Sequence, residues 1–289
     1  MMDFSSCAFG GPYEVYLIAV EGNIAAGKTT LLEQLRTDPR RLASLLFEDK
    51  RSFDYACVVP EPIDRWTSVG SEKVDLLGAM YADPLSNAMA CQMNIVNTQL
   101  DAIYDAIAKV IDEMCTEETH TIPRAKKSIL VVTERSTMSG KHVFAQSLLD
   151  KGKMPTAHWA VYCASFDAAH ALFRERVTRL FPGGQVRLST LGTVLLQVTP
   201  DQARRRAEKR GRSAEAGLPL ALYEELDKRH REVFALRNNK LVEHDIVAVD
   251  SSTLTAVLRG KAKESVLQLA VMARKKSACP PAPATPGNV

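Results

Sequence analysis

The sequence has little that would indicate a metal-binding cysteine site or a membrane protein. Its six cysteines form no CxxC pair and no spacing typical of metal ligands, and several lie in apolar or amphipathic runs. Thiols of this kind are typical of small buried side chains in a reducing compartment. No apolar run approaches the roughly 20 residues that a membrane span needs. We therefore expect free thiols and no membrane partner.

An excess of charge of one sign is also absent. The chain has 37 Lys and Arg against 34 Asp and Glu, which leaves a net charge of +3. A balance this close to neutrality gives no basis for general binding of nucleic acid or of a membrane surface. The first residues lack the basic segment of a secretory signal. We expect no nucleic-acid partner and a cytoplasmic location, with the nucleus and mitochondria as alternatives.

The order of apolar segments predicts the fold class. The 289 residues, 46% of them hydrophobic, suffice for one large domain with a substantial core. Short apolar runs alternate with stretches of helical periodicity, which is typical of an α/β fold with a parallel sheet. The predicted strands are 15–20, 56–60, 128–133, 193–198 and 246–250, and the main predicted helices are 84–118, 156–179 and 219–237.

The most informative motif follows the first predicted strand. Residues 22–29 form a complete G-x-x-x-x-G-K-[ST] pattern between that strand and the start of a helix. Glycines let backbone amides face an anion, and the helix N-terminus adds the positive end of its dipole. Lys28 would reach the β- and γ-phosphates, and Thr29 would help to hold Mg²⁺. The expected triphosphate site comprises Gly22, Asn23, Ile24, Ala25, Ala26, Gly27, Lys28, Thr29 and Thr30.

Charged residues follow the second and third predicted strands. Glu61 comes after the second strand, and Glu134-Arg135 ends the third. The carboxyl ends of parallel strands face the ligand crevice, so these side chains would lie near the phosphates. Glu61 could accept a proton from an attacking hydroxyl, Glu134 could bind Mg²⁺ or its waters, and Arg135 could hold Glu61 and the acceptor oxygen. A surface carboxylate and a structural ion pair are the alternatives.

A basic segment stands near residue 207. Five arginines and one lysine occupy the nine positions 204–212, and Gly217 and Pro219 follow. Such a run is typical of a solvated helix face or a nucleic-acid patch. The glycine between two arginines favours a mobile lid, at about 206–217, that closes guanidinium groups onto transferring phosphates.

Taken in order, these motifs resemble the deoxyribonucleoside kinase family. The family includes the deoxycytidine, deoxyguanosine and mitochondrial-type thymidine kinases, the insect multisubstrate enzyme and related viral thymidine kinases. The resemblance covers about residues 15–235. It rests on residues 21–30, Glu61-Pro62 with Trp66, 80–84 with Gln92, Glu134-Arg135-Ser136 with Phe144, and Arg206, Arg210-Gly211-Arg212, Glu215 and 217–220.

The resemblance implies a role for each matching position. Glu61 corresponds to the base that activates the nucleoside 5′-hydroxyl, and Arg135 to the arginine that positions it. Tyr81 and Glu215 match the pair that binds the 3′-hydroxyl, and Gln92 matches the amide that reads the base edge. Phe144 matches the aromatic residue that stacks on the base, and Trp66 matches a wall of that pocket. The lid arginines that bind ATP are matched by Arg206, Arg210 and Arg212.

Three departures from the family pattern bear on the substrate. Cys91 stands where the family usually has a pocket phenylalanine, so base stacking is expected on one side only. Gly140 replaces the aspartate of the deoxycytidine-preferring enzyme, which leaves room for the 5-methyl group of thymine. Gln99 occupies a position that is apolar or basic in relatives. Together they favour thymidine, with deoxycytidine or a broader range as alternatives.

The resulting prediction is a P-loop NTPase-type three-layer sandwich whose five-stranded parallel sheet is flanked by helices. We expect an ATP- and Mg²⁺-dependent deoxynucleoside kinase, a homodimer formed through 84–118 and 156–179. The expected regions are an N-terminal extension (1–14), the kinase domain (15–258), a basic C-terminal helix or extension (259–277) and a proline-rich tail (278–289).

Two alternatives stay open at this point. A thymidylate-type nucleoside monophosphate kinase shares the P-loop and the arginine lid, and a non-catalytic nucleotide-binding module could retain the loop. A GTPase is not favoured, because the sequence contains no [NT]KxD segment.

Overall fold

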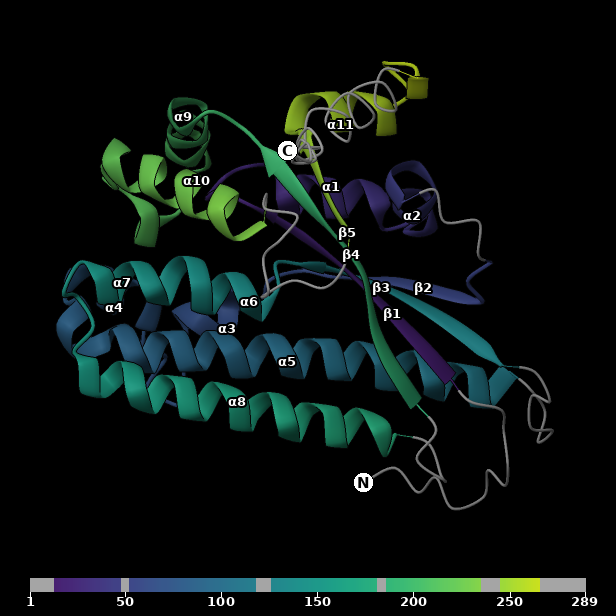
Figure 1. Ribbon diagram of the computed structural model, residues 1–289, viewed down its shortest axis with the longest axis horizontal. Helices are drawn as coiled ribbons and strands as arrows, with labels where there is room; N and C mark the ends of the chain where they lie inside the picture. The colour runs from purple at the N-terminus through teal and green to yellow at the C-terminus, as the bar shows by residue number, and fades with distance from the viewer. Residues whose placement is uncertain (1–12, 48–51, 118–125, 181–185, 235–244, 266–289) are drawn as a thin grey trace, which may run out of the picture.

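The computed structural model of the chain describes residues 13–47, 52–117, 126–180, 186–234 and 245–265. Its centre is a parallel sheet of five strands in the order β2-β3-β1-β4-β5 (Figure 1). The strands are β1 (Tyr13–Gly22), β2 (Tyr55–Val59), β3 (Lys127–Glu134), β4 (Val186–Gln197) and β5 (Asp245–Asp250). The sheet confirms the predicted α/β class.

Helices cover both faces of the sheet. The long helices α5 (Pro84–Glu117) and α8 (Thr156–Thr178) lie on one face, and α1 (Lys28–Leu35), α2 (Arg40–Phe47) and α11 (Ser251–Leu258) lie on the other (Figure 1). The remaining helices are α3 (Asp64–Thr67), α4 (Leu76–Ala82), α6 (Thr137–Ser139), the π-helix η1 (Gly140–Ala145), α7 (Gln146–Asp150), α9 (Pro200–Arg210), the 3₁₀ turn η2 (Ser213–Glu215) and α10 (Leu220–Phe234).

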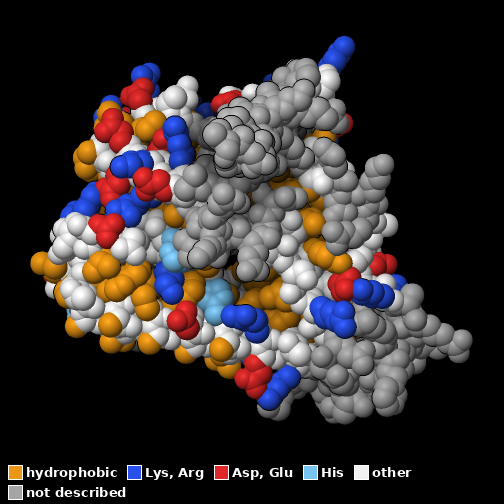
Figure 2. All heavy atoms as spheres, viewed as in Figure 1, with side chains coloured by type: hydrophobic (Ala, Val, Ile, Leu, Met, Phe, Trp, Pro, Cys, Tyr) orange, Lys and Arg blue, Asp and Glu red, His pale blue; other side chains and the backbone are white. Residues whose placement is uncertain are grey.

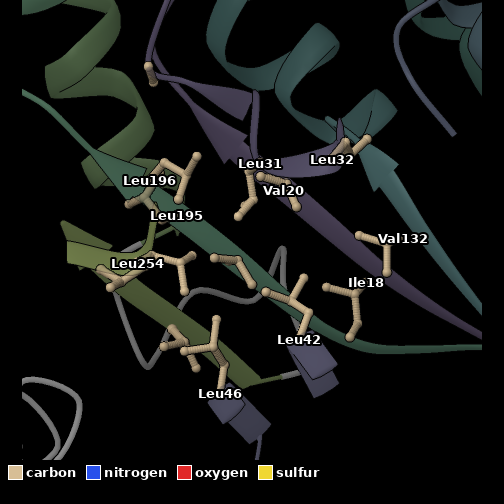
Figure 3. Close-up of a cluster of buried hydrophobic side chains, with 14 of the residues drawn as sticks. Ile18, Val20, Leu31, Leu32, Leu42, Leu46, Val132, Leu195, Leu196 and Leu254 are labelled. Atoms are coloured by element: carbon tan, nitrogen blue, oxygen red, sulfur yellow. The ribbon is translucent and has the colours of Figure 1, made fainter. Parts of the chain in front are cut away.

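The alternation of side chains along the central strands builds two cores. Ile18 and Val20 of β1 join Val132 of β3 in the cluster beneath α1 and α2, where Figure 3 shows Val20 beside Leu31 and Ile18 beside Leu42. Odd-numbered neighbours such as Val15 and Val131 point the other way, toward α5 and α8. Strands buried on both faces need apolar residues at nearly every position, which is the pattern of β1 and β3.

All five predicted strands and the three main predicted helices are present. The predicted helix 84–118 is α5, and Asp83 caps it by accepting a hydrogen bond from the Ser86 amide at 3.4 Å. β1 begins at Tyr13, so residues 13 and 14 belong to the sheet and not to an N-terminal extension. The rest of that extension, most of the basic C-terminal segment and the proline-rich tail lie outside the described residues. No described helix has the length and apolar character to cross a bilayer.

Candidate active site

The P-loop forms the turn between β1 and α1. Gly22 and Gly27 have φ angles of 144° and 100°, and a Cβ at Gly22 would lie 2.7 Å from the Leu196 carbonyl oxygen. Only glycine tolerates this backbone and this close approach. The Asn23 side chain accepts a hydrogen bond from the Ile24 amide and donates one to the Tyr223 carbonyl, both at 2.8 Å. The loop is thereby tied to α10.

Lys28 is buried at the first position of α1. Its Nζ donates to the carbonyl oxygen of Asn23 at 2.9 Å. Burial, and after it the charge of the nearby Arg135 guanidinium, lowers the pKa of Lys28 to about 8. The ammonium group therefore sits where an anionic ligand would stabilise its charge.

Glu134 lies beside Thr29. Its carboxylate accepts a hydrogen bond from the Thr29 hydroxyl at 2.8 Å. Burial raises the pKa of Glu134, and the carboxylate of Glu61 raises it as well. Two neighbouring carboxylates in a buried setting are stabilised by a cation placed between or beside them.

Arg135 connects the P-loop with Glu61. Its Nε lies 2.7 Å from Glu61 Oε1, and its NH1 donates to the Gly22 carbonyl at 2.7 Å. Arg135 has a φ of 64°, a left-handed backbone that is uncommon for a residue with a side chain. Glu21 supports this turn by accepting hydrogen bonds from the amide and hydroxyl of Ser136 at 2.7 and 2.6 Å. Strained backbone of this kind persists where the surroundings hold it in place.

Two cavities meet at the Glu61–Arg135 pair. The larger one lies over the P-loop, and its wall includes Lys28, Thr29 and Glu134. The second lies between α4, α5 and η1. Five residues line both cavities: Ile24, Glu61, Arg135, Arg212 and Glu215. A phosphate donor in the first cavity and an acceptor in the second would therefore meet at Glu61.

Most of the residues predicted to bind ATP line the larger cavity. Its wall includes Ile24, Ala25, Gly27, Lys28, Thr29, Thr30, Arg206, Arg210 and Arg212. Gly22, Asn23 and Ala26 are buried behind this wall and shape the loop. Ser251, Thr255 and Arg259 complete the wall from the α11 side, and no sequence motif had indicated them.

All seven residues predicted to bind a nucleoside line the second cavity. They are Glu61, Trp66, Tyr81, Gln92, Arg135, Phe144 and Glu215. The Trp66 indole donates to Thr98 Oγ1 at 2.8 Å, and the Arg135 guanidinium carbon lies 4.8 Å from the centre of the Phe144 ring. Burial raises the pKa of Tyr81, and Glu215 raises it further, so Tyr81 is a neutral hydrogen-bond donor.

Two glutamines face this second cavity from α5. The amide oxygens of Gln92 and Gln99 are buried and have no hydrogen-bond partner among the described residues. Burying an unpaired amide is costly, so each oxygen is available to a polar ligand. Gly140 also lines this cavity, as expected. Cys91 does not line it and is fully buried in the helical core, and the expectation of base stacking on one side only stays a prediction. Cys91 immediately precedes Gln92 on α5, so the two side chains point in different directions.

The arginines of the predicted lid lie on helix α9 and in the connection that follows it. Arg206 and Arg210 belong to helix α9, which ends at Gly211 with a φ of 68°. Arg212 follows in the connection to α10, and both Arg210 and Arg212 form ion pairs with Glu215, the latter at 3.0 Å. The predicted lid segment is therefore partly helical at its start.

Comparison with known proteins agrees with this geometry. A family model described as deoxynucleoside kinase matches residues 18–270. Deoxycytidine kinase of Rattus norvegicus is 27% identical over 254 residues, which cover 86% of this chain and 87% of the rat protein. Mitochondrial thymidine kinase 2 of Homo sapiens is 27% identical over 216 residues, covering 75% of this chain and 63% of the human one. The chain therefore belongs to the deoxynucleoside kinase family and is an ATP-dependent nucleoside kinase.

Proposed function

We propose that this enzyme transfers the γ-phosphoryl group of ATP to the 5′-hydroxyl of a deoxyribonucleoside, with thymidine as the favoured substrate. The observation that carries the proposal is the carboxylate of Glu61, which stands where the P-loop cavity and the second cavity join. Its contact with Arg135 at 2.7 Å orients it toward the junction. A carboxylate so placed can accept the hydroxyl proton as the phosphoryl group transfers.

Positioning and charge would supply most of the rate acceleration. Lys28 would bind the β- and γ-phosphates together with the P-loop amides, and Arg206, Arg210 and Arg212 would add positive charge from the lid side. Tyr81 and Glu215 would hold the 3′-hydroxyl of the sugar. Phe144 would stack on the base, Trp66 would form one wall, and the Gln92 amide would read the base edge.

The residues beside the phosphate cavity fit a Mg²⁺ ion. Thr29 and Glu134 offer a hydroxyl and a carboxylate on adjacent elements, 2.8 Å apart. Among the described residues no group of three or more His, Cys, Asp and Glu could hold a metal by itself. This suits Mg²⁺, which typically takes one or two protein ligands and completes its shell with phosphates and water. When bound, Mg²⁺ would neutralise charge on the transferring phosphoryl group.

A deoxynucleoside fits the acceptor cavity better than a nucleoside monophosphate does. The two arginines of its wall, Arg135 and Arg212, are each paired with a carboxylate, Glu61 and Glu215. Glu61 neutralises the Arg135 guanidinium, whereas Glu215 is shared by Arg212 and Arg210, so Arg212 keeps charge for the donor phosphates of the larger cavity, which it also lines. A neutral sugar hydroxyl needs no further cation in the acceptor cavity.

Steric room at Gly140 supports thymidine over deoxycytidine. A Cβ at this position would meet no heavy atom within 4 Å, so the wall leaves space for the thymine methyl group. The carboxamides of Gln92 and Gln99 can present either a donor or an acceptor, and they suit both pyrimidine edges. The room at Gly140 therefore favours thymine, whereas the hydrogen-bonding groups of the two glutamines suit thymine and cytosine alike.

Steady-state kinetics with ATP and Mg²⁺ on thymidine, deoxycytidine and thymidine monophosphate test the proposal. We expect the highest kcat/KM with thymidine and no turnover of the monophosphate. The variant Gly140→Val should reduce kcat/KM for thymidine more than for deoxycytidine, because its side chain would fill the methyl space. A higher kcat/KM for deoxycytidine in the wild type would overturn the base preference, and turnover of the monophosphate alone would overturn the proposed reaction.

A further inference from the structure

Beside Arg135 lies a histidine that no sequence motif indicated. His230 belongs to α10 and only 1% of its surface is exposed. It lines neither of the two cavities. Its Nε2 is 3.2 Å from NH1 of Arg135, and its Nδ1 is 2.6 Å from the carbonyl oxygen of Leu226. The ring therefore bridges the helix backbone and the guanidinium.

The two partners determine the protonation of the ring. A backbone carbonyl can only accept a hydrogen bond, so Nδ1 carries a proton. An arginine NH group can only donate, so Nε2 presents its lone pair. The imidazole is therefore neutral and in a single tautomer. Burial lowers the pKa of His230 well below its usual value, and the charge of Arg135 lowers it further, which agrees with this assignment.

The neutral ring completes the hydrogen bonds of one end of Arg135. NH1 carries two protons, and its two hydrogen-bond acceptors in the described part of the chain are the Gly22 carbonyl oxygen at 2.7 Å and His230 Nε2 at 3.2 Å. Because the guanidinium is planar, holding NH1 also sets the direction of Nε, which points to Glu61 at 2.7 Å. The chain of contacts runs from α10 through Arg135 to the carboxylate at the cavity junction.

Packing keeps the imidazole in this position. The His230 ring meets Phe144 edge to face, with ring centroids 5.9 Å apart, and it lies 6.3 Å from the Phe234 ring. The guanidinium of Arg135 packs on the same Phe144. Arg135 itself has a left-handed backbone and depends on its surroundings for its orientation.

We propose that His230 is a positioning residue, which holds Arg135 through a neutral Nε2 acceptor and thereby aligns Glu61 for phosphoryl transfer. The expected effect on kcat rests on the proposed function, whereas the hydrogen bond between His230 and Arg135 does not depend on it. This contact assigns to α10 a role in the reaction geometry in addition to its place in the core.

Three substitutions separate positioning from packing. His230→Gln keeps an acceptor that can reach Arg135 but loses the contact with the Leu226 carbonyl. His230→Asn keeps a donor for Leu226 but is too short to reach Arg135. His230→Phe fills the volume and offers neither. We expect kcat to fall roughly 10- to 100-fold in the Asn and Phe variants, with smaller changes in KM, and to be substantially restored in the Gln variant.

The comparison of kcat between the Asn and Gln variants can contradict this inference. If His230→Asn retains as much kcat as His230→Gln, the bond to Arg135 has no positioning role and the ring serves packing alone. Thermal unfolding of each variant identifies a loss of activity that follows from a loss of folding. In the background of Arg135→Met, replacing His230 with Asn should cause no further loss of kcat, because the two residues act through one contact.

A spectroscopic measurement keeps the inference separate from the proposed reaction. The ¹⁵N NMR spectrum of histidine-labelled enzyme contains the resonances of all six histidines. The resonances that the wild type shows and the variant His230→Gln lacks belong to His230. We expect a neutral Nδ1–H tautomer, and a shifted Nε2 resonance in Arg135→Met. A charged ring or an Nε2 resonance unaffected by Arg135→Met would overturn the inference. If the wild type phosphorylates no nucleoside, the proposed function fails, and this spectrum still decides whether His230 holds Arg135.

Discussion

Lys28 is a buried cation, and none of the described carboxylates is in hydrogen-bond contact with it. Its Nζ donates to backbone carbonyls of the P-loop, and its pKa is lowered to about 8, first by burial and then by Arg135. A triphosphate beside it would favour the charged form and raise that pKa again. By linkage, binding of ATP should then take up protons at pH values near 8.

We predict that ATP affinity is greatest below pH 8 and decreases as the pH rises above it. Below pH 8 the ammonium is present before ATP arrives, whereas above pH 8 part of the binding free energy is spent on protonating Lys28. Isothermal titration calorimetry at pH 8, in buffers of different ionisation enthalpy, measures the proton uptake. Lys28→Arg is the control, because its guanidinium stays charged and should take up no protons. Equal uptake in both proteins would contradict this explanation.

Glu61 is the second residue whose role can be measured directly. We predict that Glu61→Gln lowers kcat by about 10²- to 10⁴-fold and leaves ATP affinity unchanged, because the amide cannot accept the hydroxyl proton. Stopped-time assays for turnover and equilibrium titration with ATP separate the two effects. Asp64→Asn, an exposed carboxylate three residues away, is the matched control and should retain full activity. A kcat near that of the wild type would remove Glu61 from the role of base.

At the scale of elements, local sequence patterns predicted the helices and strands whose residues are apolar at regular spacing. α5 matched its prediction to within one residue because its helical periodicity, its cap and its proline at the first position agree. β4 was predicted only from residue 193, yet it begins at Val186. Its first half contains polar, exposed residues and pairs with β1 through backbone hydrogen bonds, which side-chain hydrophobicity does not indicate.

The contact between α2 and β4 provides a prediction at this scale. A Cβ at Gly192 would lie 2.0 Å from the Phe47 ring, so the strand and the helix end approach closely only because residue 192 has no side chain. We predict that Gly192→Ala lowers the free energy of unfolding by about 1–3 kcal/mol through overpacking. Chemical denaturation measures this. In the background of Phe47→Ala the cost should largely disappear, and an unchanged cost would contradict the close-contact explanation.

At the scale of the whole molecule, the outer face of α8 bears apolar and small side chains. Val161 and Leu172 are 51% and 56% exposed, and Ala157, Ala160, Ala164, Ala168 and Ala171 are also exposed on this helix. Figure 2 shows hydrophobic side chains along the lower edge of the molecule, over α8. Small residues let two helices approach closely, and exposed apolar faces of this kind mark contact surfaces. We therefore propose that two copies associate through α8 and its neighbour α5.

The proposed association through α8 leads to a prediction for solution behaviour. Val161→Glu together with Leu172→Glu should convert the protein to monomers, because four carboxylates would be buried in the interface. Light scattering coupled to size-exclusion chromatography measures the mass. Val74→Glu, at a residue 49% exposed and far from α8 in sequence, is the control and should leave the dimer intact. A monomeric wild type at micromolar concentration would contradict the proposal.

The sequence by itself determined the sheet, the P-loop and the identity of the charged residues at the strand ends, because these depend on local periodicity and on contiguous motifs. Only the tertiary structure decided which of those residues share a cavity, that Cys91 faces the core, and that Ser251 and Arg259 complete the phosphate cavity. It also decided that His230, 95 positions away in the chain, is a further partner of Arg135 besides Glu61 and the Gly22 carbonyl. Such contacts arise when α10 packs beside β1 and β4, and no local pattern of residues encodes a distance across the fold.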